Sequence, residues 1–292
     1  MAIDYARLKA RPFPDRVHRY SEQDTILYAL AVGLGADPMD RRQLDFVYGD
    51  GPGKGGLKAL PTMAVVLGAP GFWLINPDTG VDWKQVLHGE QGLVIHHPLP
   101  SSGTVFGRTV IEEIIDKGKG KGALLYSRRD VFDEASGTLL CSLTSTTFCR
   151  GDGGFGGPAG PTRDPHRLPE RASDVAVDLP TLPQAALIYR LSGDDNPLHA
   201  DPVVAAAAGF PRPILHGLCT FGVVGHALLR QLAHYQPARL KSMAVRFSAP
   251  VFPGETIRTE IWHEGAGRAG FRARALERDA IVLNNGLAEF TG

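Results

Sequence analysis

Between residue 217 and about residue 234, apolar side chains recur at the spacing of an α-helix. Leu218, Phe221 and Val224 begin the series, and Leu228 and Leu232 continue it. Other apolar residues fill the remaining faces, so most of the circumference is apolar. A helix of this kind has to be enclosed by protein. We therefore predict one long buried helix, with two glycines in its middle where a sheet can approach closely.

The two halves of the chain contain the same order of strand signals. Residues 98–105 read PLPSSGTV and residues 250–257 read PVFPGETI, with a threonine and a β-branched residue at matching positions. A glycine-rich hairpin signal follows each, and two β-rich segments close each half: 123–131 and 138–148 in the first, 270–276 and 281–290 in the second. Short strands joined by such turns indicate antiparallel sheet. The repetition indicates a duplication.

One buried helix held by a curved antiparallel sheet is the hot-dog arrangement, so the duplication predicts an α+β protein with a double hot-dog fold. Residues 151–173 are rich in Gly, Pro and Arg and lack apolar periodicity, which is typical of a linker. We expect an N-terminal hot-dog domain over 1–150 and a C-terminal one over 174–292. The N-terminal domain should be degenerate. Residues 21–33 predict a helix capped by Ser21, but no counterpart of the long buried helix follows.

Charge and cysteine content restrict the classes of partner and compartment. Lys+Arg and Asp+Glu both number 31, so no net field gathers nucleic acid or an anionic membrane surface. The apolar runs are too short to span a bilayer, and no secretory signal or C-terminal peroxisomal tripeptide is visible. Three cysteines do not suggest a disulfide framework. These features predict a cytoplasmic location.

Residues 189–202, which read YRLSGDDNPLHADP, hold the strongest candidates for chemistry. Gly193 should end a helix-like stretch, and the Asn-Pro step should force a turn. Asp194, Asn196 and His199 then fall in one tight loop. A carboxylate and an imidazole together can hold a water and move its protons near neutral pH. A purely structural polar turn explains the same residues, so the loop alone does not decide between the two interpretations.

A second segment, PILHGL at residues 213–218, leads into the start of the predicted buried helix. The first N–H groups of a helix have no intrahelical partner, and the helix dipole favours negative charge there. Gly217 would let a ligand oxygen approach its N–H and would stabilise an oxyanion. The alternative is that Gly217 only permits the bend into the helix.

In this order and spacing, the two segments resemble the hydratase 2 motif of MaoC-like (R)-specific 2-enoyl-CoA hydratases. That family includes the hydratase domains of peroxisomal multifunctional enzyme type 2 and their bacterial counterparts. VLHGEQ at 86–91 and FSAPVFPGET at 247–256 fit as well, so the resemblance covers nearly the whole chain. It implies a hydro-lyase of fatty-acid metabolism, such as β-oxidation, that reversibly adds water to trans-2-enoyl-CoA and gives (3R)-3-hydroxyacyl-CoA.

The resemblance also implies roles for individual residues. Asp194 and His199 would be the catalytic pair, Asn196 would help hold the water, and the Gly217 N–H would bind the thioester oxygen. The residues implied to contact the acyl-CoA are His88, Gly89, Lys117, Asp195, Pro197, Leu198 and Phe247. Asp195 departs from the residue common in relatives and adds a charge beside the site. His216 either caps the helix or touches CoA.

No cofactor is expected, because CoA arrives as part of the substrate. The histidines lack paired Cys or His residues at ligand spacing, so no metal site is predicted. The glycines at 151, 153 and 156 match a dinucleotide-binding pattern, but Gly157-Pro158 follows them where that motif needs a helix.

Alternative functions stay open from the residues themselves. Another hot-dog enzyme on acyl-CoA would be a dehydratase of branched or dicarboxylic hydroxyacyl-CoA, or a thioesterase. A non-catalytic acyl-CoA-binding protein would be expected to have lost Asp194 or His199, and both are present. A homodimer also stays open, since a double hot dog imitates a dimer within one chain and can pair again.

The resemblance further implies that the N-terminal domain accommodates the acyl chain. Its irregular stretch from 37 to 80 would leave a space where the second half has its long helix. We expect apolar side chains to line this space, namely Leu60, Met63, Val65, Val66 and Leu67.

Overall fold

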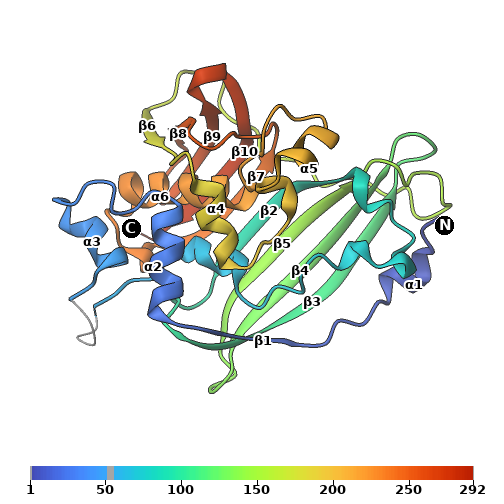
Figure 1. The fold of residues 1–292 in the computed structure, drawn as a ribbon, viewed down its shortest axis with the longest axis horizontal. Helices are drawn as coiled ribbons and strands as arrows, with labels where there is room; N and C mark the ends of the chain where they lie inside the picture. The colour runs from blue at the N-terminus through green and yellow to red at the C-terminus, as the bar shows by residue number, and fades with distance from the viewer. Residues whose placement is uncertain (1, 51–55, 292) are drawn as a thin grey trace.

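A computed structural model describes residues 2–50 and 56–291 and contains one large antiparallel sheet (Figure 1). Its strands are β1 (Arg16–Tyr20), β2 (Val86–Ile95), β3 (Gly103–Asp116), β4 (Ala123–Asp133), β5 (Leu139–Cys149), β6 (Val175–Pro180), β7 (Leu240–Phe247), β8 (Thr256–His263), β9 (Arg268–Ala275) and β10 (Ala280–Phe290). The α-helices are α1 (Tyr5–Lys9), α2 (Glu22–Ala31), α3 (Arg41–Val47), α4 (Ala185–Tyr189), α5 (Pro202–Ala207) and α6 (Gly217–Leu232). The predicted α+β class is confirmed.

Strand order reveals the duplication. The sheet runs β1-β3-β4-β5-β2 and continues β7-β10-β9-β8-β6. Read from its outer edge toward the middle of the sheet, each half places its strands in the order first, third, fourth, fifth, second. The two halves meet where β2 pairs with β7. The hairpin and strand signals of the sequence fall on β3–β5 and β8–β10, so the predicted repetition is confirmed. The fold is the double hot dog.

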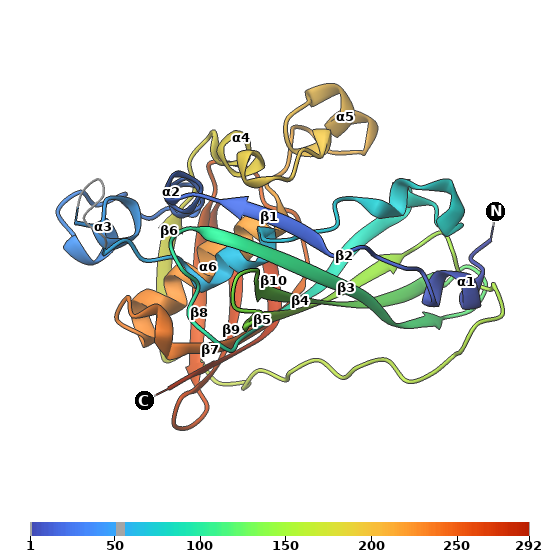
Figure 2. The same cartoon turned by 90° about the horizontal axis from the view of Figure 1, so that it is seen from below.

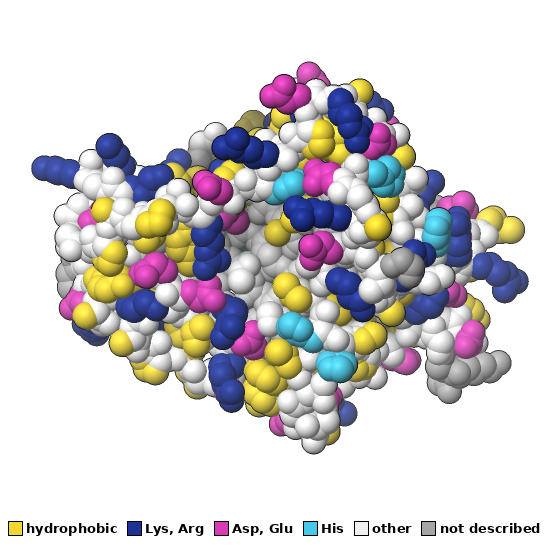
Figure 3. All heavy atoms as spheres, turned by 180° about the vertical axis from the view of Figure 1, so that it is seen from behind, with side chains coloured by type: hydrophobic (Ala, Val, Ile, Leu, Met, Phe, Trp, Pro, Cys, Tyr) yellow, Lys and Arg dark blue, Asp and Glu magenta, His cyan; other side chains and the backbone are white. Residues whose placement is uncertain are grey.

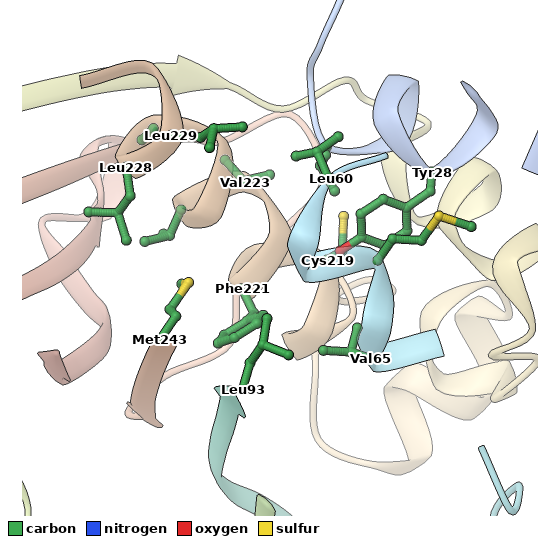
Figure 4. Packing of buried hydrophobic residues seen from close by; sticks show 14 of the residues in the cluster. Tyr28, Leu60, Val65, Leu93, Cys219, Phe221, Val223, Leu228, Leu229 and Met243 are labelled. Atoms are coloured by element: carbon green, nitrogen blue, oxygen red, sulfur yellow. The ribbon is translucent and has the colours of Figure 1, made fainter. Parts of the chain in front are cut away.

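Helix α6 lies in the interior, as its all-round apolar pattern predicts. Figure 4 shows Met243 of β7 on one side of the helix and Leu60 and Val65 of the first half on the other. The glycines of α6 do not face the sheet, contrary to the prediction. A β-carbon at Gly222 would lie 2.6 Å from Val32 Cγ1, and one at Gly225 would lie 2.4 Å from Thr62 Cγ2. Helical segments of the first half approach there instead.

The first half has no long central helix among its described residues, which confirms that part of the sequence interpretation. Helix α2 begins with the capping box formed by Ser21 and Asp24, and the central position is taken by a short 3₁₀ helix, η1 (Pro61–Val66). The expected space for an acyl tail is not open. Leu60, Met63, Val65 and Leu67 are at most 3% exposed and Val66 packs beside them, so these side chains fill the core.

Between β5 and β6 the chain forms neither helix nor strand and runs along the outside of the sheet (Figure 2). No helix follows the glycine pattern at 151–156. Instead, the Asp116 carboxylate at the end of β3 accepts hydrogen bonds from the N–H groups of Gly154 (2.7 Å) and Gly156 (2.8 Å). Farther along, His166 contacts Glu264 at 2.9 Å. The segment is thus fastened to both halves of the sheet.

The surface carries mixed charge. Figure 3 shows acidic and basic side chains interspersed over one face of the molecule, in keeping with the balanced composition. Within residues 2–50 and 56–291, no helix has both the length and the apolar character needed to cross a membrane.

Candidate active site

The loop after α4 is held in a defined shape by its own side chains. Gly193 has a φ of 106° and ends the short 3₁₀ turn that extends α4, as predicted. The Asp194 carboxylate accepts the Asn196 N–H at 3.3 Å. Asn196 Oδ1 accepts the Leu198 N–H at 3.1 Å and so caps a second 3₁₀ turn, η6 (Pro197–His199). This chain of turns brings the predicted catalytic pair together.

The His199 ring has one fixed and one available nitrogen. Its Nδ1 lies 2.8 Å from the Ile214 carbonyl oxygen, and because a carbonyl only accepts, Nδ1 carries the proton. Burial lowers the pKa of His199, against the opposing effects of the Ile214 carbonyl and the Asp194 carboxylate. The ring is therefore neutral at pH 7, and Nε2 can accept a proton. Asp194, His199 and His216 each offer one atom within 4.8 Å of the others.

His216 is the third member of this cluster. It is 1% exposed, and its Nε2 donates to the Asp194 carbonyl oxygen at 3.2 Å. Its ring stacks on that of His199, with 3.8 Å between the ring centroids. His216 occupies the N-cap position of α6, but its side chain makes no cap hydrogen bond, so the imidazole itself does not cap the helix. Sequence alone held a signal for this residue only in its position directly before Gly217.

Gly217 begins α6 beside the loop. The N–H groups of Cys219 and Thr220 both donate to the His216 carbonyl, whereas no described residue accepts the Gly217 N–H. That donor is available for a ligand oxygen. A β-carbon at this position would lie 3.1 Å from Cε1 of Phe247. The ring of His88 packs against Phe247, with 4.7 Å between centroids.

This contact brings the two halves together at the site. His88 and its neighbour Gly89 lie on β2, and Phe247 ends β7, so the pairing of β2 with β7 aligns them. An ion pair strengthens the seam: the Arg246 guanidinium contacts Glu90 Oε1 at 2.7 Å. The sequence interpretation missed this pair. The sequence indicated this pair only in that Glu90 follows Gly89 and Arg246 precedes Phe247, both predicted binding residues.

The remaining predicted residues lie at different distances from the cluster. Pro197 and Leu198 belong to η6 itself. Asp195 is exposed and pairs with Arg190 at 3.0 Å. Lys117 is exposed after the end of β3, which β4 and β5 separate from β2. The structure therefore does not bring Lys117 to the catalytic loop.

The chain is similar to known proteins over its whole length. Residues 18–151 match the model of the MFE-2 hydratase 2 N-terminal domain, and residues 165–285 match the MaoC-like domain. The 3-hydroxyacyl-thioester dehydratase Y of Mycobacterium tuberculosis is 41% identical over 99% of both chains. The peroxisomal enoyl-CoA hydratase 2 of Arabidopsis thaliana is 38% identical over 94% of this chain and 92% of its own.

A solved structure agrees with these matches. The MaoC-like dehydratase of Phytophthora capsici has a TM-score of 0.83 and 34% identity, and the match covers 98% of each chain. Fold and site thus define a MaoC-like protein. Within that class, the chain belongs to the hydratase 2 family, which confirms the resemblance drawn from the sequence.

Proposed function

We propose that this protein is an (R)-specific 2-enoyl-CoA hydratase, a hydro-lyase that reversibly adds water to trans-2-enoyl-CoA and forms (3R)-3-hydroxyacyl-CoA. One observation carries the proposal. The Asp194 carboxylate and the His199 imidazole lie within 4.8 Å of each other in one loop, beside the Gly217 N–H at the start of α6, which no described residue accepts. Its relatives are named as hydratases and a dehydratase of acyl thioesters.

These groups match the needs of the reaction. A bond forms between the water oxygen and Cβ, the water loses one proton, and Cα gains one. Asp194 and His199 hold the water and exchange these protons as one unit, so both transfers occur on the same face of the substrate. Asn196 uses its oxygen within the loop and directs its NH₂ group to the water. The Gly217 N–H stabilises the charge that develops on the thioester oxygen.

The acyl-CoA is held along the seam of the two halves. In our proposal His88, Gly89 and Phe247 line the thioester, and Asp195, Pro197 and Leu198 border the opening. Lys117 meets a CoA phosphate as a point charge, at some distance from the loop. No metal or cofactor takes part. Asp194, His199 and His216 bring three possible ligand atoms together, but in this proposal they serve proton transfer and its support, and no ion is placed among them.

The test follows the loss of the conjugated-thioester absorbance when trans-2-enoyl-CoA is added, with chiral analysis of the product. A thioesterase would release free CoA thiol instead, which a thiol reagent detects. A non-catalytic binding protein would bind enoyl-CoA and leave the absorbance unchanged. Formation of the (3S) product would contradict the proposed stereochemistry.

We also propose the division into 1–150, a linker at 151–173 and 174–292, with the acyl chain accommodated by the first part. The two family models, which match 18–151 and 165–285, support this division. Because the core around η1 is filled, an acyl tail has to displace that short 3₁₀ segment. Its few backbone hydrogen bonds make such a movement easier than the displacement of α6 would be.

For compartment and assembly we propose a cytoplasmic homodimer. All three cysteines are buried free thiols, which suits a reducing compartment. Apolar side chains are exposed on the sheet, including Val94 (44%) and Val110 (40%), and offer a surface for a second copy. Cell fractionation tests the compartment. Sedimentation equilibrium tests the mass, and a monomer at micromolar concentration would contradict the dimer.

A further inference from the structure

His216 has contacts that a purely structural core residue does not need. Its Nε2–H donates to the Asp194 carbonyl oxygen at 3.2 Å, and its ring covers that of His199 at a centroid distance of 3.8 Å and an angle of 30°. The next residue in the chain is Gly217. One side chain thus touches both members of the acid–base pair and adjoins the oxyanion donor.

Packing alone does not account for an imidazole here. With the proton on Nε2, the Nδ1 atom carries a lone pair, and this atom is buried without a hydrogen-bond partner among the described residues. A buried polar atom left unpaired is unfavourable, and an apolar ring of similar size would avoid that cost. Capping of α6 by the imidazole is excluded as well, because the side chain makes no cap hydrogen bond.

The charge state of the ring suits a supporting role. The titratable groups around it are Asp194 and His199 in the loop, Tyr189 on α4 against its ring, and Arg190 farther away. Burial and then the neighbouring His199 lower the pKa of His216 to about 4. His216 is therefore neutral under working conditions. A proton taken up during the reaction resides on His199 or Asp194, and no second charge opposes it.

We propose that His216 is a positioning residue of the hydratase: its Nε2–H fixes the Asp194 backbone, and its ring face fixes the orientation of His199 relative to the Gly217 N–H. This inference rests on the proposed function. Displacement of a catalytic group by about 1 Å can reduce the rate by about 10²-fold. Loss of either contact should therefore lower kcat while the substrate still binds.

Two substitutions separate the contacts. His216→Gln retains a donor toward the Asp194 carbonyl and removes the ring face, whereas His216→Phe retains the ring and removes the donor. We expect each to lower kcat by about 10- to 100-fold with KM changed less than about 3-fold. His226→Gln is the matched control. His226 is also 1% exposed and lies on α6, the helix that follows His216, but its ring nitrogens contact Val32 and Tyr235 rather than the loop.

A second readout distinguishes positioning from general destabilisation. In an Asp194→Ala background, His216→Phe should cause little further loss of kcat, because the two residues act through one unit. Multiplication of the two losses would overturn the proposal. So would a folded His216 variant with kcat within about twofold of wild type, or an equal loss of kcat in the His226→Gln control.

Nitrogen-15 NMR of the histidine rings in the unmodified protein keeps the proposal testable even when the variants fail to fold. We expect His216 to be neutral at pH 7 with its proton on Nε2, and His199 to carry its proton on Nδ1. An imidazolium, or a proton on Nδ1 of His216, would overturn the proposed contact. Absence of hydratase activity with the expected tautomers would instead refute the proposed function and leave the geometry standing.

Discussion

The two halves of the molecule share one strand order but differ in the element that occupies the central position of each half. In the second half that element is α6, sixteen residues long, and it begins at Gly217, whose N–H no described residue accepts. In the first half it is η1, six residues long, and it begins at Pro61, which has no N–H to offer. The same place in the topology therefore offers an available backbone N–H in one copy only, and this is the N–H that we propose as the oxyanion donor.

The loops preceding these elements differ in the same way. The second-half loop holds Asp194 and His199 within reach of each other. The first-half loop after α2 contains Asp37 and Asp40, whose carboxylates accept backbone N–H groups, with no histidine beside them. The comparison teaches that one copy of the duplicated scaffold brings a carboxylate and an imidazole together, while the other copy contributes His88 beside Phe247 and the packing around α6.

The largest expected effect concerns the loops. Asp194→Ala and His199→Ala should each lower kcat by about 10²-fold or more, the usual scale of acid–base catalysis. The double variant should lose far less than the product of the two, since both groups act on one water. Asp37→Ala, in the corresponding loop of the first half, should leave kcat unchanged. Near-normal hydration of crotonyl- or decenoyl-CoA by either single variant would refute the assignment.

The second prediction concerns the first residue of α6, which a substitution would change to proline, the residue that begins η1. Gly217→Pro removes one donor, which typically costs about 2.7–4 kcal/mol in the transition state, or about 10²- to 10³-fold in kcat. The fold should tolerate it, because proline suits a first helical turn and the preceding His216 has a ψ of 134°. Circular dichroism has to confirm the fold before kinetics are compared.

Gly217→Ala is its matched control. It keeps the N–H but pushes its β-carbon against Phe247 at 3.1 Å, so kcat and substrate affinity should fall together and by less. The added methyl group would therefore displace the Phe247 ring, and the substrate would be affected through that ring. A folded Gly217→Pro enzyme with normal kcat would show that the enolate is stabilised elsewhere.

A third effect concerns the contact between the halves. Gly222→Ala and Gly225→Ala insert β-carbons 2.6 Å from Val32 and 2.4 Å from Thr62, so each should reduce the free energy of unfolding by about 1–3 kcal/mol. Gly103→Ala, where the nearest atom lies at 3.9 Å, should stay within about 0.5 kcal/mol. Denaturant titration measures both. Equal stabilities would mean that the halves do not pack through α6 as described.

The fourth prediction concerns pH. His216, at the N-cap of α6, and His226, within the helix, are both 1% exposed, and burial lowers the pKa of each to about 4. An unfolded histidine has a pKa of about 6.5, so below that pH the unfolded chain binds more protons. The free energy of unfolding should fall from pH 6.5 to 4, by about 1.4 kcal/mol per unit for each histidine. His226→Gln should reduce that slope, and an unchanged slope would contradict its burial.

The smallest effect tests the acyl role of the first half. If η1 yields to an acyl tail, kcat/KM should rise only a few-fold from C4 to C10, because the displacement of η1 offsets most of the about 0.8 kcal/mol that each buried CH₂ contributes. Rates with C4, C8, C10 and C16 enoyl-CoAs measure this. A steady fall with chain length would mean that the first half only packs against α6.

Local features of the molecule could be predicted from the sequence. Strands β3–β5 and β8–β10, the cap of α2, the burial of α6 and the loop that joins Asp194 to His199 all depend on side-chain period, turn residues and spacing over a few positions. The Gly217 N–H could be predicted as a donor for the same reason, since the residues of the family motif around it are close together in the chain. These are properties that a short stretch of sequence determines on its own.

Tertiary structure alone decided which element covers which. An apolar pattern predicts that a face is buried but not which element covers it. We therefore expected a sheet against Gly222 and Gly225, where the end of α2 and η1 lie instead. For the same reason the sequence did not predict that Leu60 and Met63 fill the core, because an irregular stretch shows no pattern that reveals how its side chains pack. His216 acquired its contacts only when the loop folded back over the start of α6. The seam of β2 and β7 likewise united His88 and Phe247, which are far apart in the chain.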